Sequence, residues 1–143
     1  MENYSYILIA GSRDFEDLDV FATVFNKMAE LLPQSVLASR NIVIVEGGAK
    51  GVDTMAREFA KGNGLLFKEF KPEWNKYGRA AGPKRNDTMT EFVAEHNGRA
   101  LFFWDGESKG TKQCIMSARK RGLPMQVWNT AEGRLMSEQE LPA

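Results

Sequence analysis

Short runs of apolar residues alternate along the chain with longer stretches in which apolar side chains recur every three or four positions. Each short run is rich in β-branched or aromatic residues, which is typical of a strand buried on both faces of a parallel sheet. We therefore predict five strands. They span residues 4–10, 42–45, 65–70, 99–104 and 125–128.

The stretches between these strands have the periodicity of amphipathic helices. After the second strand, apolar residues recur at positions i, i+3, i+4, i+7 and i+8, and they form one face of a helix that ends at Gly62. This face consists of Val52, Met55, Ala56, Phe59 and Ala60. Comparable stripes begin at Leu18, Met89 and Ile115.

Strands that alternate with helices predict an α/β fold. We expect a Rossmann-like three-layer domain with a five-stranded parallel sheet in the order 3-2-1-4-5 and helices on both faces. In that order, strands 1 and 4 are neighbours whose following helices leave towards opposite faces. Ligands bind at such a switch point, beyond the carboxyl ends of the strands.

Composition narrows the functional classes. The 143 residues suit one domain, and we expect a core over residues 4–128 and a peripheral tail over residues 129–143. Lys+Arg and Asp+Glu both number 19, so the net charge is zero. The protein as a whole therefore has no positive potential that would attract nucleic acid or an anionic membrane. One Cys and one His exclude a disulfide framework and a Cys/His metal cluster, and no apolar run is long enough to span a membrane. We expect a cytoplasmic protein with no metal and no required cofactor.

A glycine-rich loop joins the second strand directly to its helix. Gly47, Gly48 and Gly51 lack side chains where the chain must reverse, and Lys50 and Asp53 flank the turn. A strand that enters a helix through glycines leaves backbone N–H groups at the positive end of the helix dipole, which favours phosphate. Taken alone, the spacing equally fits a tight turn that serves only helix packing.

Two further strand-to-helix junctions carry similar chemistry. The first strand runs into Gly11, Ser12, Arg13 and Asp14, where the arginine can pair with phosphate and the aspartate can cap a helix or accept from ribose. The fourth strand runs into a loop with a carboxylate, two hydroxyls, a lysine and a glycine. These residues are Asp105, Ser108, Lys109, Gly110 and Thr111.

A long connection of about a dozen residues, 71–82, follows the third strand without periodicity. It contains Trp74, which either stacks on a base or packs on the core. Arg85 and Asn86 follow in the first turn of the next helix. Since all four connections follow parallel strands, we expect them to meet at one rim and to bind a phosphate-bearing ligand.

Together these motifs also resemble a known family. Gly11-Ser12-Arg13, residues 47–53, residues 81–86 with Met89, and residues 108–111 are similar, in this order, to the YspA-like branch of the SLOG superfamily. That superfamily comprises Rossmann-like domains related to DprA and to the LOG phosphoribohydrolases. The resemblance implies a nucleotide or nucleotide-derived ligand, such as an ADP-ribose-like or nucleoside phosphate species, and by analogy a homo-oligomer.

The chain departs from the LOG pattern where catalysis is concerned. LOG enzymes place a glutamate within one turn of their second glycine loop, whereas Lys112, Gln113 and Cys114 follow Thr111 here. A catalytic carboxylate would then have to be Asp53, Glu46 or Asp14, and Asp53 and Glu46 are the two candidates that we carry forward. We therefore expect a binding or sensing protein first, and a LOG-like N-glycosidase acting on nucleoside monophosphates as the alternative.

Single-stranded DNA binding, by analogy with DprA, is a second alternative. It would use four cations around the long connection, Lys76, Arg79, Lys84 and Arg85. The zero net charge weighs against it, because nucleic-acid affinity depends largely on counterion release.

Overall fold

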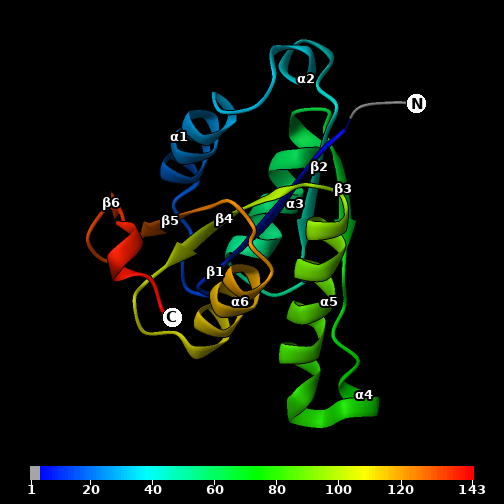
Figure 1. The fold of residues 1–143 in the computed structure, drawn as a ribbon, viewed down its shortest axis with the longest axis vertical. Coiled ribbons are helices and arrows are strands. Elements are labelled where there is room, and N and C mark those ends of the chain that lie inside the picture. Colours follow the sequence, from blue (N-terminus) through cyan, green and yellow to red (C-terminus); the bar gives the residue numbers. More distant parts are fainter. Residues whose placement is uncertain (1–3) are drawn as a thin grey trace.

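A computed structural model describes residues 4–143, in which helices flank a six-stranded sheet (Figure 1). Its sheet contains β1 (Ser5–Gly11), β2 (Ile42–Glu46), β3 (Leu66–Glu69), β4 (Arg99–Trp104), β5 (Met125–Asn129) and β6 (Arg134–Leu135). The helices are α1 (Leu18–Ala29), α2 (Gln34–Ser39), α3 (Val52–Gly62), α4 (Trp74–Tyr77), α5 (Ala81–Glu95) and α6 (Lys109–Lys120). Two short 3-10 helices, η1 (Gly78–Ala80) and η2 (Glu138–Glu140), complete the described elements.

The sheet order is β3-β2-β1-β4-β5-β6, and the first five strands are parallel. The predicted order of these five strands is confirmed, but the prediction of a purely parallel five-stranded sheet is wrong. Arg134 and Leu135, in the segment expected to be a peripheral tail, pair antiparallel with Asn129 and Trp128. A two-residue strand is too short to produce a periodic pattern, so the sequence gives no sign of it.

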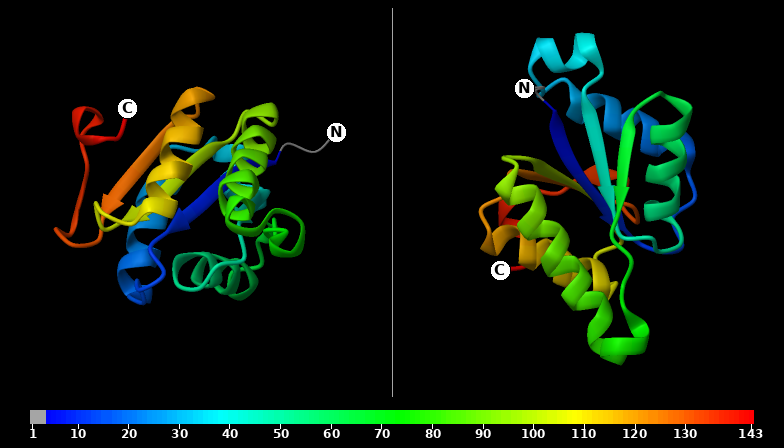
Figure 2. Two further views of the ribbon diagram at one scale, coloured as in Figure 1. Left: turned by 90° about the horizontal axis from the view of Figure 1, so that it is seen from below. Right: turned by 90° about the vertical axis from the view of Figure 1, so that its right-hand side faces the viewer.

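Helices cover both faces of the sheet, as the views in Figure 2 show. Because successive strand residues point to opposite faces, Ile7 and Ile9 pack in a core with α1 and α3. Leu8 and Ala10 pack in a second core with α5 and α6. The helices after β1 and β4 therefore lie on opposite faces, and β1 and β4 are adjacent, which creates the expected switch point.

Two connections contain helices that the apolar pattern does not predict. The connection between α1 and β2 contains α2, whose Val36 joins the core with α1 and α3. The connection after β3, predicted over residues 71–82, contains α4 and η1, and α5 already begins within it at Ala81. As a result, α4 and the start of α5 project beyond the sheet (Figure 1). Over residues 4–143, none of the helices combines the length and the apolar character that crossing a bilayer requires.

Candidate functional site

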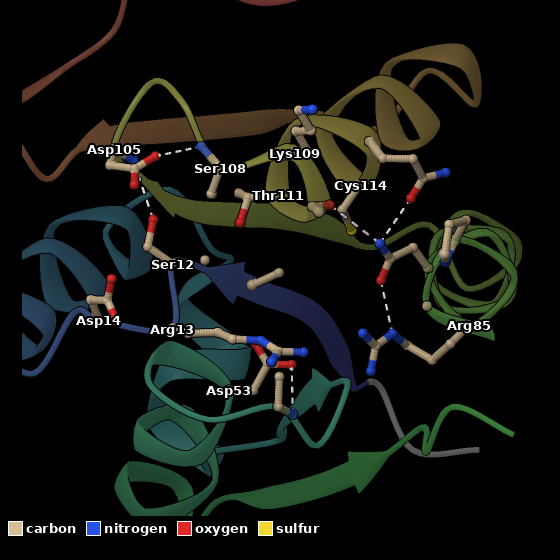
Figure 3. A pocket seen from close by; sticks show the side chains of 18 of the residues that line it. Ser12, Arg13, Asp14, Asp53, Arg85, Asp105, Ser108, Lys109, Thr111 and Cys114 are labelled. Carbon is tan, nitrogen blue, oxygen red and sulfur yellow. Dashed lines mark hydrogen bonds between the residues drawn. The ribbon is translucent and has the colours of Figure 1, made fainter. Parts of the chain in front are cut away.

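A cavity of about 560 Å³ lies at the switch point, beyond the carboxyl ends of β1 and β4 (Figure 3). The loops after these two strands form part of its wall, and α4, the start of α5 and the first turns of α3 and α6 form the rest. Four connections that are distant in sequence therefore meet at one place, as the sheet order requires.

Most of the residues predicted from the sequence line this cavity. They are Gly11, Ser12, Arg13, Asp14, Asp53, Trp74, Arg85, Asn86, Asp105, Ser108, Lys109, Gly110 and Thr111. Glu46, Gly47, Gly48, Lys50 and Gly51 are not among the lining residues, and Lys50 and Gly51 line a separate groove between α1 and α3. The roles of all these residues in binding stay predictions.

The loop after β1 is fixed by close contacts with β4 and its following loop. A Cβ atom at Gly11 would collide with the carbonyl oxygen of Phe103, so only glycine allows the two strands to approach here. The N–H of Ser12 donates to that same carbonyl at 2.9 Å, and its Oγ accepts from the N–H of Asp105 at 3.3 Å. The exposed Arg13 follows directly and is therefore presented at the cavity from a fixed backbone.

Helix α1 is capped by Asp17, whose Oδ1 accepts from the N–H of Val20 at 3.1 Å. Of the two roles predicted for Asp14, helix capping is therefore carried out by Asp17 instead. Asp14 is exposed and lines the cavity beside Arg13, as Figure 3 shows.

The glycine loop after β2 does not form the open phosphate cradle that its sequence suggests. The N–H groups of Gly47 and Ala49 donate to Oδ2 of Asp53 at 3.0 and 3.3 Å. The N–H of Gly48 donates to Oε1 of Glu46 at 2.7 Å. Carboxylates of the chain itself thus occupy the donors that a phosphate would use.

Gly51 serves the close packing of this loop. Its φ is +76°, and a Cβ atom there would lie 2.5 Å from the carbonyl oxygen of Arg13 and 2.6 Å from that of Ser12. The loops after β1 and β2 therefore contact each other through backbone. The packing interpretation of this glycine is the one that the geometry favours.

The two candidate catalytic carboxylates are both buried. Burial raises the pKa of Asp53, while N–H groups of Ala49 and Gly47 and the charges of Arg85 and Arg13 lower it. Burial is also the largest cause that raises the pKa of Glu46, to about 7. Glu46 is 0% exposed and does not line the cavity, so only Asp53 borders the space where a substrate could lie.

The start of α5 is tied both to the glycine loop and to α6. Nη1 of Arg85 donates to the carbonyl of Gly47, and its Nε donates to Oδ1 of Asn86 at 2.8 Å. Nδ2 of Asn86 donates to Oε1 of Gln113 at 2.8 Å and to the carbonyl of Gly110 at 3.4 Å. Asn86 therefore positions the first turn of α6, a role that the sequence did not indicate.

The loop after β4 holds the first turn of α6 against the cavity. Oδ1 of Asp105 accepts from the N–H groups of Glu107 and Ser108 at 2.9 and 2.8 Å, and Nε1 of Trp104 donates to the carbonyl of Ser108 at 3.0 Å. Burial alone would raise the pKa of Asp105, but the N–H groups of Ser108 and Glu107 hold this pKa below its ordinary value. The carboxylate is therefore ionised at neutral pH and fixes the entry to the helix.

Gly110 leaves the backbone of this first turn open. A Cβ atom built there would meet no atom within 4 Å, and its φ is not in the left-handed region. Neither turn geometry nor packing therefore requires glycine. The N–H groups of the first turn have no acceptor within their own helix, so they are available to a group in the cavity.

The cavity also contains residues that were not assigned to the site from sequence. These are Ala10, Ala49, Gly82, Pro83, Gln113 and Cys114, and Arg79, which was predicted only for the DNA-binding alternative, also lines the cavity. Gln113 and Cys114 lie three and four positions after Gly110, so helical spacing from that glycine could have identified them. Cys114 is 1% exposed and burial raises the pKa of its thiol to about 12, which excludes a thiolate nucleophile at neutral pH.

An aromatic and basic corner, formed by residues 71–85, borders the cavity on one side. Trp74 is 52% exposed and lines the cavity from α4. The ammonium groups of Lys76 and Lys84 lie 5.1 and 4.8 Å from the ring centroid of Tyr77. An exposed tryptophan at the edge of a cavity offers a flat surface for a planar group.

Part of the chain that builds this site matches the model of a known protein family. The model of the YspA, cpYpsA-related SLOG family matches residues 6–77, which run from β1 to the end of α4. The chain belongs to this SLOG family. The match includes the loops after β1 and β2 and the connection that carries Trp74.

Two individual proteins are similar to this SLOG-family chain. The Gene 61 protein of Mycobacterium phage D29 is 32% identical over 124 residues, which cover 83% of this chain and 92% of that protein. The X-ray structure of DNA processing protein A (DprA) from Streptococcus pneumoniae has a TM-score of 0.57 at 19% identity. The match covers 87% of this chain and 50% of that structure, so the SLOG-family chain spans about half of its length, and the likeness shows the fold alone.

Proposed function

We propose that the chain binds a nucleotide or nucleotide-derived ligand, with a phosphate group over the first turn of α6. The observation that carries this proposal is the open space at Gly110, where the first turn of α6 lines the cavity and a Cβ atom would meet no atom within 4 Å. Backbone N–H groups and the helix dipole favour an anion at such a place. Lys109 in the same turn and Arg13 on the facing loop add positive charge.

The size and lining of the cavity support a ligand larger than inorganic phosphate. Its volume of about 560 Å³ falls within the ordinary range for small-molecule sites, about 300–1,000 Å³. Arg79 and the exposed Trp74 line the cavity, and the tryptophan ring can stack on a base. Asp14 can accept a hydrogen bond from a ribose hydroxyl beside Arg13.

Binding without turnover fits the buried carboxylates better than hydrolysis does. Asp53 accepts two backbone hydrogen bonds and Glu46 does not line the cavity. A carboxylate that stabilises an oxocarbenium-like transition state must reach the sugar. For the N-glycosidase alternative, Asp53 lines the cavity whereas Glu46 does not. Loss of base release from a nucleoside monophosphate in Asp53→Asn would support that activity.

Isothermal calorimetry tests the proposal with ADP-ribose, AMP and ribose 5-phosphate, and adenosine serves as the ligand without phosphate. We expect the phosphate-bearing compounds to bind more tightly than adenosine, and Arg13→Gln and Lys109→Gln each to weaken binding about tenfold. Lys27→Gln is the matched control, because Lys27 is exposed on α1 and lines none of the described cavities. Absence of binding for all phosphate-bearing compounds at millimolar concentration would refute the proposal.

The aromatic and basic corner favours single-stranded DNA as a second candidate partner. Residues 71–85 contain five cations and one acid, although the whole chain is neutral. Exposed Trp74 and Tyr77 could stack on bases there. A fluorescent oligothymidine whose polarisation rises with protein, and falls steeply with salt, would support this function. No change in polarisation at low salt would remove it.

A further inference from the structure

Glu46 is a buried acid whose placement the proposed binding site does not by itself explain. It is the last residue of β2 and is 0% exposed. Its Oε1 accepts from the N–H of Gly48 at 2.7 Å, whereas its Oε2 is buried without a hydrogen-bond partner in residues 4–143. A carboxylate oxygen left unpaired in the interior is costly, and a neutral carboxyl is less so.

The groups packed around Glu46 also favour its neutral form. Asp53 faces it from α3 and Glu69 faces it from the neighbouring β3, where the two glutamates are direct partners in the sheet. Arg57 on α3 opposes them, but its Nη1 is engaged with Oε1 of Glu69 at 3.2 Å. Burial is the largest cause that raises the pKa of Glu46, and the charges of Asp53 and Glu69 raise it further. The N–H of Gly48 and the charge of Arg57 lower this pKa, and the net result is a value of about 7.

The turn that holds Glu46 is connected to the cavity through Gly47. The N–H of Gly47 donates to Asp53, and its carbonyl accepts from Arg85. Both Asp53 and Arg85 line the cavity, and Figure 3 shows their side chains in it. The same short turn therefore holds a buried acid and is hydrogen-bonded to two charged residues of the cavity.

We propose that Glu46 is the proton-binding group of this site, and that its carboxyl holds a proton when an anion occupies the cavity. This inference rests on the proposed anion binding. An anion in the cavity competes with Asp53 for Arg13 and Arg85, so the charge of Asp53 is less neutralised and the field at Glu46 becomes more negative. Anion binding and protonation of Glu46 then favour each other, because linkage is reciprocal.

ADP-ribose is the probe for this linkage, because its pyrophosphate, unlike a phosphate monoester, does not titrate near neutral pH. We expect its Kd to rise about fivefold between about pH 6 and about pH 8, which corresponds to about 1 kcal/mol. In Glu46→Gln the Kd should change less than about twofold over this range. Glu91→Gln, which removes an exposed acid from α5, should keep the wild-type pH dependence.

A measurement without ligand separates this inference from the proposed function. In NMR spectra of the free wild-type protein, the amide of Gly48 should titrate with a midpoint between about pH 6 and 8, and this step should be absent in Glu46→Gln. A Gly48 amide that does not titrate there overturns the inference even if ADP-ribose binds, as does a pH-independent Kd in wild type. If Gly48 titrates but no phosphate-bearing compound binds, the titration of Glu46 is upheld and the proposed function fails.

Discussion

Replacing Gly110 with alanine separates the contribution of this glycine to binding from its effect on stability. Within a helix, alanine is favoured over glycine by about 0.5–1 kcal/mol. A Cβ at position 110 meets no atom within 4 Å, so no repulsion in the ligand-free protein offsets this gain. We therefore expect the melting temperature of Gly110→Ala to rise by about 2–4 °C.

The same methyl group should obstruct the ligand. In a helix, the Cα–Cβ bond tilts towards the N-terminus, so the added methyl projects to where a phosphate would accept from the first-turn N–H groups. The hydrogen bonds of about 2.9 Å that phosphate needs would be lengthened. We expect Kd for ADP-ribose to increase at least about tenfold, or by about 1.4 kcal/mol.

Calorimetry and thermal unfolding of the same preparations provide the assay. Gly62→Ala is the matched control, since Gly62 ends α3 away from the cavity and a Cβ there also meets no atom within 4 Å. It should leave Kd unchanged. If Gly110→Ala binds ADP-ribose as tightly as wild type, the phosphate does not lie over α6 and the reasoning is refuted.

Three further predictions concern other parts of the site. In calorimetry, Trp74→Ala should weaken the binding of ADP-ribose several-fold more than the binding of ribose 5-phosphate. Equal losses of affinity for the two ligands would contradict base stacking. Gly51→Ala should lower stability to urea by more than about 2 kcal/mol, because its φ is +76° and its Cβ would press on backbone atoms; wild-type stability would show that the loops do not contact there. Glu46 has a folded pKa of about 7, above its ordinary 4.5, so its contribution to stability is complete below about pH 4.5 and is lost as pH rises through about 7. In urea, the free energy of unfolding of Glu46→Gln should therefore rise relative to that of wild type by up to about 3 kcal/mol between about pH 5 and 8. A difference between the two proteins that does not change with pH would contradict this.

The sequence predicted the framework of the site because that framework depends on periodicity and chain order. Apolar runs such as residues 42–45 identify central strands, and their alternation with helices predicts a parallel sheet, for which 3-2-1-4-5 is the commonest order. That order brings Ser12 and Gly110 to one rim although about a hundred residues separate them. These features depend on pattern and not on the conformation of any single side chain.

What the sequence could not predict depends on individual side-chain contacts. The glycine loop after β2 looks like a phosphate cradle until Asp53 and Glu46 are seen to accept from its N–H groups. The sequence does not distinguish the roles of Gly51 and Gly110. A Cβ atom would collide with backbone atoms at Gly51, whereas at Gly110 it would meet no atom within 4 Å. β6 was missed because Arg134 and Leu135 form a strand only through pairing with β5.

NMR can locate the bound ligand on the chain residue by residue. In a titration of isotope-labelled protein with ADP-ribose, we expect the largest amide shifts at Lys109, Gly110 and Thr111, with further shifts around Arg13. This expectation would be contradicted by shifts concentrated in the groove between α1 and α3, around Met55 and Phe59. Spectra that do not change at millimolar ADP-ribose, AMP or ribose 5-phosphate would contradict it equally.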